Sequence, residues 1–296
     1  MPELPDITVY AESLDAKVRG TALNHIRVAQ PFVLRTALPP ISSAEGRRVS
    51  GIQRLGKRIV IALEGDLFLV LHLMIAGRLR WLGLGVKAPA RGALAMLEFD
   101  AGTLLFTEAG SQRRASMHLL AGREALAAMD PGGIDVLAAD GATFAQALVS
   151  ENHTLKRALT MPQLFSGIGN AYSDEILHRA RLSPVTLTRA LKPVEVQRLL
   201  DASKTVLLKW TAALRAEAAA QGGWPEKVTA FRPDMAVHGR YGLPCPDCGA
   251  PVQRIVHASN EANYCARCQT GGKLLADRAL SRLLKASWPK SIDDLG

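Results

Sequence analysis

Four cysteines near the end of the chain constrain its fold more than any other feature of the sequence. Cys245 and Cys248 form one Cys-x-x-Cys pair, and Cys265 and Cys268 form a second pair after sixteen intervening residues. Each pair can place two thiolates on a tight turn, so the two turns together offer the ligands of a tetrahedral zinc site. An iron site or a redox pair would use the same residues. Because the protein fills all four ligand positions, the pattern predicts one structural Zn²⁺ that stabilises a small β-hairpin.

The chain begins with Met1, Pro2 and Glu3. After removal of Met1, Pro2 would carry a secondary amine at the terminus. A free α-amino group has a pKa of about 8, so a useful fraction is neutral at physiological pH and can attack an electrophilic carbon to form an iminium ion. The Glu3 carboxyl stands beside it, where proton transfer is needed. The same residues also suit an ordinary N-terminus, so the other motifs decide between these two interpretations.

The first 130 residues are predicted to form a β-sandwich with one flanking helix. Asp6–Arg19 has the apolar spacing of an amphipathic helix, and short strand-like runs such as Arg58–Leu63 and Leu67–Leu73 follow it. Turn signals separate these runs. Closely spaced strands after one leading helix indicate a sandwich.

The rest of the chain is expected to be helical apart from the cysteine region, which gives an α+β protein of several domains. An Ala-rich stretch around Pro131 is the best candidate for a linker, and Pro193–Ala220 reads as a long helix. An amphipathic basic pattern follows the last cysteine. The expected parts are a β-sandwich domain over 1–130, a linker over 131–142, a helical domain over 143–236, a zinc-finger hairpin over 237–270 and a helical C-terminal extension over 271–296.

The charge of the chain favours an anionic partner. Its 36 lysines and arginines exceed its 27 acidic residues, which gives a formal net charge of +9 at pH 7. Such an excess suits nucleic acid, although many basic proteins bind nothing acidic. The chain start lacks a secretory signal pattern, and the longest apolar run, Leu67–Ala76, is broken by His72 and too short to span a bilayer. We therefore expect a cytoplasmic protein without a membrane partner, associated with the nucleoid if the source is bacterial.

A glycine turn precedes one of the predicted helices. Gly167 and Gly169 flank Ile168, and Asn170 then stands where an N-cap is expected before the helix Ala171–Arg181. A helix that follows a glycine turn leaves free backbone N–H groups that can hold a phosphate. A plain helix–turn–helix packing unit would show the same pattern.

Two further motifs are basic. Lys57 follows Gly56 just before an apolar strand, where a lysine can contact a phosphate, carry a proton or simply be solvated. Arg113 and Arg114 form a pair in a segment expected to be a loop. A solvated charge pair explains these two arginines without any ligand, so neither motif identifies a function by itself.

Together these motifs resemble the formamidopyrimidine-DNA glycosylase/endonuclease VIII family of base-excision repair enzymes, in the same order from residue 1 to about residue 270. Pro2–Pro5 is similar to the catalytic N-terminus of that family, and Gly56-Lys57 to its hairpin lysine. Gly167–Asn170 resembles the helix–two-turn–helix signature, and Val237–Arg240 with the four cysteines resembles the C-terminal finger. The combination of all four is highly specific.

The resemblance implies a bifunctional DNA glycosylase and AP lyase, acting as a monomer on damaged double-stranded DNA. Pro2 would attack C1′ of an oxidised nucleotide flipped out of the duplex, and an iminium ion would join enzyme to sugar as the base departs. Glu3 would move protons at the sugar, and Lys57 would supply a phosphate contact or a proton for β- or β,δ-elimination. Asn170 and Lys156 would hold a backbone phosphate, and the zinc hairpin would lie against the DNA backbone.

The residues that would fill the gap left by the flipped base depart from the family pattern. Ile75 takes the place of a methionine, and Met74 lies one residue earlier, on the other face of the strand. Arg113 or Arg114 can fill the gap, whereas Ala115 stands where the family has a phenylalanine. The resemblance therefore implies a smaller wedge, with altered base flipping or opposite-base discrimination.

Two more departures concern the lesion and the product. Asn260 stands five residues before the third cysteine, where the family usually has an arginine against the lesion phosphates. An amide can bind a phosphate but brings no charge, so the product could stop at β-elimination. The stretch from Gly222 to Val237 is shorter than in the formamidopyrimidine branch, which favours an endonuclease VIII-like or different lesion range.

Two other functions compete with catalysis. A damaged-DNA or DNA-structure binding protein could use the same scaffold with weak or no chemistry, but such a protein gains little from Pro2, Glu3 and Lys57 together. A zinc-ribbon helix–turn–helix module bound to RNA leaves the N-terminus unexplained. The sequence therefore favours the glycosylase and lyase.

Overall fold

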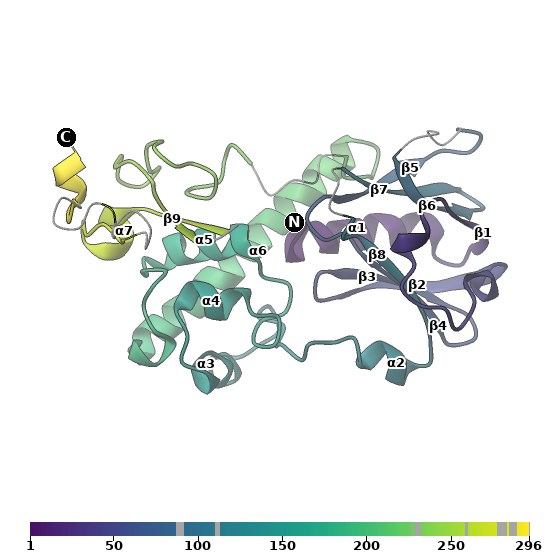
Figure 1. The fold of residues 1–296 in the computed structure, drawn as a ribbon, viewed down its shortest axis with the longest axis horizontal. Coiled ribbons are helices and arrows are strands. Elements are labelled where there is room, and N and C mark those ends of the chain that lie inside the picture. The colour runs from purple at the N-terminus through teal and green to yellow at the C-terminus, as the bar shows by residue number, and fades with distance from the viewer. Residues whose placement is uncertain are drawn as a thin grey trace. The chain divides into compact units, whose positions relative to one another are not determined.

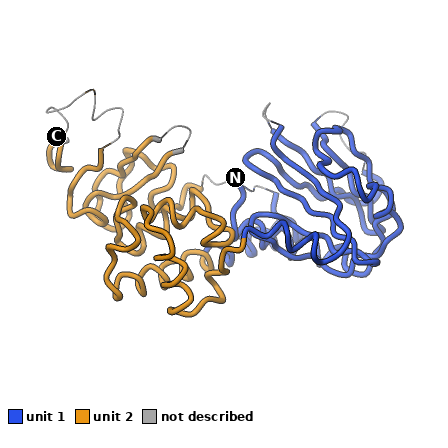
Figure 2. Tube along the Cα trace, turned by 60° about the horizontal axis from the view of Figure 1, so that its bottom comes forward, with its two compact units in different colours: residues 1–131, 210–229 blue, residues 132–209, 230–296 orange. Residues whose placement is uncertain are grey.

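The computed structural model describes residues 1–86, 92–109, 113–226, 228, 232–257, 260–276, 283 and 289–295. The chain divides into two compact units (Figure 2): unit 1 is Met1–Pro131 with Trp210–Thr229, and unit 2 is Gly132–Lys209 with Ala230–Gly296. The division falls inside helix α6 (Pro193–Ala220), which therefore contributes to both units. The sequence suggests one helical domain over 143–236, whereas the fold assigns 210–229 to unit 1.

Unit 1 is a sandwich built from one eight-stranded antiparallel sheet in the order β5-β7-β6-β1-β2-β3-β4-β8 (Figure 1). Strands β1 and β2 pair only at their ends, so the sheet folds into two four-stranded halves. The predicted β-sandwich is thus confirmed. Its elements are α1 (Leu4–Val18), β1 (Ala22–Val28), β2 (Arg47–Leu55), β3 (Arg58–Leu63), β4 (Leu67–His72), β5 (Gly77–Leu82), β6 (Ala93–Phe99), β7 (Gly102–Glu108), β8 (Ser116–Ala121) and α2 (Arg123–Ala127).

The core of unit 1 lies between the two halves of the sheet and under α1. Alternate residues of β3, such as Ile59 and Ile61, face it, as period-two strands require. Tyr10 of α1 and Trp224, which follows α6, close the core, with their ring centroids 5.5 Å apart. Unit 1 therefore needs the segment Trp210–Thr229, which follows its last strand only after a long stretch of unit 2.

Unit 2 combines short helices with a small hairpin. Strands β9 and β10 pair in register, and a separate apolar core that includes Val237, Val252 and Tyr264 supports them. Part of the expected linker 131–142 is docked here, because Ile134 bridges to Phe165. The elements of unit 2 are α3 (Gly141–Ser150), α4 (Leu155–Thr160), α5 (Asn170–Ala180), the first part of α6, β9 (Gln253–His257), β10 (Asn260–Tyr264) and α7 (Ala266–Thr270).

The C-terminal extension returns to the hairpin core. Leu274 and Ile292 are buried in it, and Lys273 bridges to Ser291. The basic helix expected between them falls mostly on 277–282 and 284–288, which lie outside the described residues. Within the described parts of the chain, no helix has the length and apolarity needed to cross a membrane.

Candidate functional site

The first residues of the chain are fixed by the start of α1. Glu3 is the N-cap, and its backbone N–H donates to Asp6 Oδ2 over 2.9 Å in a capping box. The N–H of Ile7 donates to the Glu3 carbonyl, also over 2.9 Å. Glu3 and Asp6 are each 2% exposed, and Pro2 is buried. The terminus is therefore held rigidly, with a carboxyl group one residue from Pro2.

The terminal amine lies among charges of both signs. In the structure it belongs to Met1, and removal of Met1 would pass it to the next residue. Burial lowers the pKa of this amine, the carboxylates of Glu3 and Asp6 oppose that effect, and the positive charges of Arg78 and Lys57 add to it. The net result is a pKa below the ordinary value of 8.0. A larger neutral fraction follows, and the neutral amine is the form that attacks carbon.

Lys57 occupies the tip of the hairpin between β2 and β3. Leu55 pairs with Arg58, so Gly56 and Lys57 form a two-residue turn, and Gly56 has the positive φ, +59°, that this turn needs. The charge of Lys57 acts on the terminal amine and on His72. The fold therefore places Lys57 at the same end of the sheet as the terminus.

His72, at the end of β4, is a site residue that sequence reasoning did not single out. It pairs with Arg58 of the neighbouring strand. Burial lowers the pKa of His72 to about 4, and the positive charges of Arg58 and Lys57 act in the same direction. The imidazole is therefore neutral near pH 7. The available signal was a single histidine inside the apolar run Leu67–Ala76.

The turn between β4 and β5 presents Ile75. Its side chain is 52% exposed, whereas the neighbouring Met74 is partly buried and adopts a φ of +52°. Gly77 closes the turn, because a side chain there would clash with the carbonyl of Leu73. Of the two neighbours, Ile75 is thus the one that can reach a ligand from this turn.

Ala109, which follows β7, donates its backbone N–H to the Ala76 carbonyl of this turn over 3.1 Å. The N–H groups of Arg114 and Ala115 donate to Glu108 Oε1 over 3.0 and 3.2 Å. Arg113 and Arg114 are exposed, and the Arg113 guanidinium lies 5.5 Å from the ring centroid of Phe32. Ala115 is fully buried in the core of unit 1. Its position is therefore inside the fold, not at the surface where a wedge residue would act.

Asn170 is the first residue of α5. The sequence suggests Asn170 as the N-cap, but the helix begins one residue earlier than expected and Gly169, with extended backbone, is the N-cap. Freed from capping, the Asn170 side chain donates from Nδ2 to the Glu261 carbonyl over 2.9 Å. Asn170 thus joins the start of α5 to strand β10. Asn260 begins β10, but its side chain lies outside the described residues.

Lys156 is expected to contact a DNA phosphate, but in the structure its ammonium is bonded within the protein. Its ammonium donates to the Asn170 carbonyl over 2.6 Å, to Ser173 Oγ over 2.8 Å and to Asp174 Oδ1 over 2.5 Å. The side chain is 15% exposed and that of Asp174 is 0% exposed. An ammonium has three protons, and the protein accepts all of them. Lys156 therefore braces the first turns of α5 from within.

Two acidic residues of α5 hold the segment that leads into the hairpin. Glu175 accepts the backbone N–H groups of Ala236, Val237 and His238 over 2.8 to 3.0 Å. Asp174 Oδ2 lies 2.8 Å from His238 Nδ1. Sequence reasoning missed both residues, although two adjacent carboxylates on the buried face of a helix are a signal of internal pairing.

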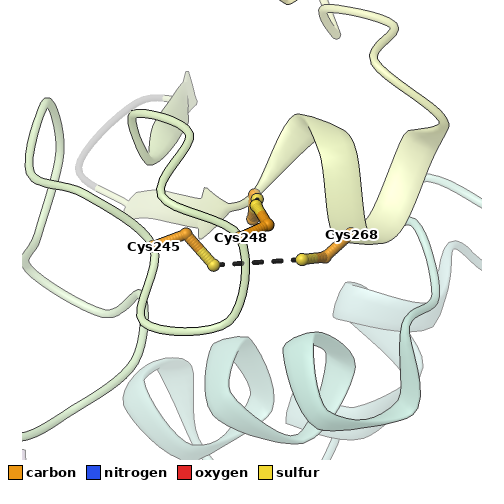
Figure 3. Close-up of side chains that lie close together, drawn as sticks. Cys245, Cys248 and Cys268 are labelled. Atoms are coloured by element: carbon orange, nitrogen blue, oxygen red, sulfur yellow. Dashed lines mark hydrogen bonds between the residues drawn. The ribbon is translucent and has the colours of Figure 1, made fainter.

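The side chains of Cys245, Cys248 and Cys268 lie close together (Figure 3), and Cys265, between β10 and α7, completes a cluster of four whose sulfur atoms all lie within 4.8 Å of one another. Cys245 Sγ lies 3.9 Å from Cys268 Sγ, and Cys248 Sγ lies 3.4 Å from Cys265 Sγ. Thiolates bound to one tetrahedral Zn²⁺ at about 2.3 Å lie roughly 3.8 Å from one another. The spacing of the sulfurs and the all-thiolate donor set therefore fit a structural zinc ion.

Comparison with known proteins gives matches along most of the chain. Three family models match: the formamidopyrimidine-DNA glycosylase N-terminal domain over residues 1–117, the formamidopyrimidine-DNA glycosylase H2TH domain over 133–220, and a zinc finger found in FPG and IleRS over 242–271. The last match contains all four cysteines, which confirms the predicted zinc site.

Curated relatives and solved structures agree with these matches. A formamidopyrimidine-DNA glycosylase of Thermus thermophilus is 34% identical, over 92% of this chain and 100% of the relative. The crystal structure of MutM (Fpg) from the same organism is 33% identical, with a TM-score of 0.72 and coverage of 90% and 98%. The fold is also that of Lactococcus lactis Fpg in complex with abasic-site DNA, at 23% identity, coverage of 90% and 99%, and a TM-score of 0.79.

Proposed function

Because the chain belongs to the formamidopyrimidine-DNA glycosylase family, we propose that its reaction begins with attack of the Pro2 nitrogen on C1′ of a damaged nucleotide. Membership makes the chain a DNA glycosylase of base-excision repair, an enzyme that binds DNA, and AP lyase activity is typical of the family. The one observation that carries the proposed step is the placement of Pro2, which is buried directly before the N-cap of α1 and next to Glu3, whose side chain is 2% exposed.

The steps of this reaction balance as follows. The Pro2 nitrogen forms a bond to C1′ as the bond from C1′ to the base breaks, and the base leaves with the electron pair and takes up a proton. The nitrogen then loses its own proton, the C1′–O4′ bond breaks and O4′ takes up a proton, so the sugar ring opens and an iminium ion joins Pro2 to C1′. The Glu3 carboxyl, on the residue next to Pro2, passes protons at the sugar and at the iminium ion. In the elimination, C2′ loses a proton as the C3′–O bond breaks and the phosphate leaves with the electron pair. Water then adds to C1′ and the bond from C1′ to the Pro2 nitrogen breaks, which releases the sugar. Lys57, at the hairpin tip, contacts a phosphate or supplies a proton in that elimination.

Surface residues of each unit can contact a DNA duplex from which one nucleotide is flipped out. Ile75 enters the gap left by the flipped base, with Arg113 or Arg114 facing the opposite strand. Asn170, at the start of α5, contacts a backbone phosphate. Asn260 contacts the DNA beside it, because Asn260 precedes Glu261, the β10 residue whose carbonyl accepts from Asn170. We infer action as a monomer on duplex DNA carrying an oxidised base, in the cytoplasm and on the nucleoid if the source is bacterial. The zinc supports the hairpin and takes no part in the chemistry.

Borohydride trapping tests the proposal. The protein is incubated with duplexes that carry different oxidised bases or an abasic site, and both covalent complexes and strand ends are scored. We expect a trapped complex with the natural chain, a weak one with Pro2→Gly, and no base release with Glu3→Gln. A phosphate at both ends indicates β,δ-elimination, and an unsaturated aldehyde indicates β-elimination alone.

A binding protein without chemistry is the second candidate, because Ala115 stands where the family pattern has a phenylalanine and, being buried, offers no side chain to the duplex. Gel-shift binding of the same duplexes separates it from an enzyme. Tight binding with no trapped complex on any damaged duplex would support that candidate and contradict the proposed reaction.

A further inference from the structure

His178, in the last turn of α5, lies against the zinc site although it is not one of the four cysteine ligands. Its Nε2 is 3.3 Å from Cys245 Sγ and 4.0 Å from Asp247 Oδ2. His178 is 3% exposed and Cys245 is 2% exposed, so water does not compete for this contact. The nearer of the two neighbours is therefore the sulfur.

The chemistry of the pair fixes the direction of the hydrogen bond. A cysteine bound to zinc is a thiolate, which can only accept, so the ring nitrogen that faces it must carry the proton. We propose that His178 is a positioning residue of the zinc site, whose Nε2–H donates to the metal-bound thiolate of Cys245. Such outer contacts orient metal ligands and slow the loss of the metal.

The contact also joins the metal to the helix that carries Asn170. At one end of α5, Asn170 Nδ2 donates to the Glu261 carbonyl of β10. Just past the other end, Gln269 Nε2 of α7 donates to the Leu182 carbonyl over 2.9 Å. With His178 on Cys245, the zinc hairpin and α5 are connected at both ends of the helix. Zinc loading therefore steadies the residue that the proposed function places on a DNA phosphate.

Zinc release to an excess of a coloured chelator tests the hydrogen bond. His178→Phe keeps most of the ring volume without a donor, His178→Gln keeps a donor near the Nε2 position, and His178→Ala removes both without any clash. We expect release to be about 10-fold faster or more in the Phe and Ala variants, and the Gln variant to stay within about 3-fold of the natural chain. His153→Phe is the control, because His153 of the same unit bonds to Glu151 and not to a cysteine.

A spectroscopic reading distinguishes a hydrogen bond to sulfur from simple packing. With Co²⁺ in place of zinc, the thiolate-to-metal charge-transfer band should shift in His178→Ala and return toward the natural position in His178→Gln. Equal release rates in all variants, or equally fast release from the Gln and Phe variants, would overturn the proposal. Neither measurement uses Pro2, so failure here is distinguishable from failure of the proposed function, which borohydride trapping reports.

Discussion

Replacing Lys156 with methionine tests whether this lysine serves the interior or the DNA. The change leaves the carboxylate of Asp174, which is 0% exposed, with His238 at 2.8 Å and Asn263 at 3.4 Å as its remaining side-chain partners. Removing one partner of a buried pair costs about 3–5 kcal/mol. Since two partners remain, we expect the lower end, about 3 kcal/mol, which is roughly a 150-fold change in the opening equilibrium.

Hydrogen exchange and salt-dependent DNA binding read out the two roles separately. We expect the amides of α5 to exchange roughly 150-fold faster in Lys156→Met. The slope of log affinity against log salt should stay the same, because a phosphate-contacting lysine would lower it by about 1. Lys192→Met is the matched control, since Lys192 is exposed at the start of α6 and should change stability by less than about 0.5 kcal/mol.

The opposite pattern would refute this reasoning. If Lys156→Met left the exchange of α5 unchanged and reduced the salt slope by about 1, the lysine would be a phosphate contact after all. A double variant sharpens the result: adding Asp174→Asn to Lys156→Met removes the buried charge that has lost its lysine and should recover part of the lost protection.

Three other changes give independent checks. Arg78→Gln removes a positive charge near the terminal amine, so the pKa of the amine rises. The pH below which borohydride trapping declines should then move to a higher value. Arg80 is exposed on the same strand, and Arg80→Gln should leave that pH unchanged. Protonating His72 is unfavourable in the folded state, where its pKa is about 4 against 6.5 ordinarily. The free energy of unfolding should therefore fall by about 3 kcal/mol as the pH drops from 6.5 to 4. Urea unfolding of His72→Gln should not show that fall. Ile75→Ala should slow base release from duplex DNA roughly tenfold in single-turnover assays, and leave cleavage of a single-stranded abasic site unchanged.

The elements with strong local signals could be predicted from the sequence. The bounds of β3 and α6 agree with the apolar runs Arg58–Leu63 and Pro193–Ala220. Strand β2 was not predicted, because its sequence RRVSGIQRL begins with two arginines, contains Gly51 and shows no regular alternation of apolar and polar residues. Such a strand forms because it pairs with β3, and pairing across a sheet leaves little trace in a short window of sequence.

The site shows the same contrast. Pro2, Glu3 and the cysteines are adjacent or regularly spaced, so residue type and spacing pointed to their chemistry. The partner of Lys156 lies eighteen positions away, on another helix, and no spacing rule links the two. The lysine was therefore expected to bind phosphate, and only the packing of α4 against α5 reveals that its charge is used inside the protein.

The discontinuous core of unit 1 has a consequence for the growing chain. Trp224 and Val228 belong to the same core as the sandwich strands, and Leu214 and Ala218 cover Val9 of α1. During synthesis, the apolar side of α1 stays exposed to solvent until these residues leave the ribosome. The first residues to be made are thus among the last to reach their native surroundings, and a chain truncated before Trp224 should be a ready target for proteases.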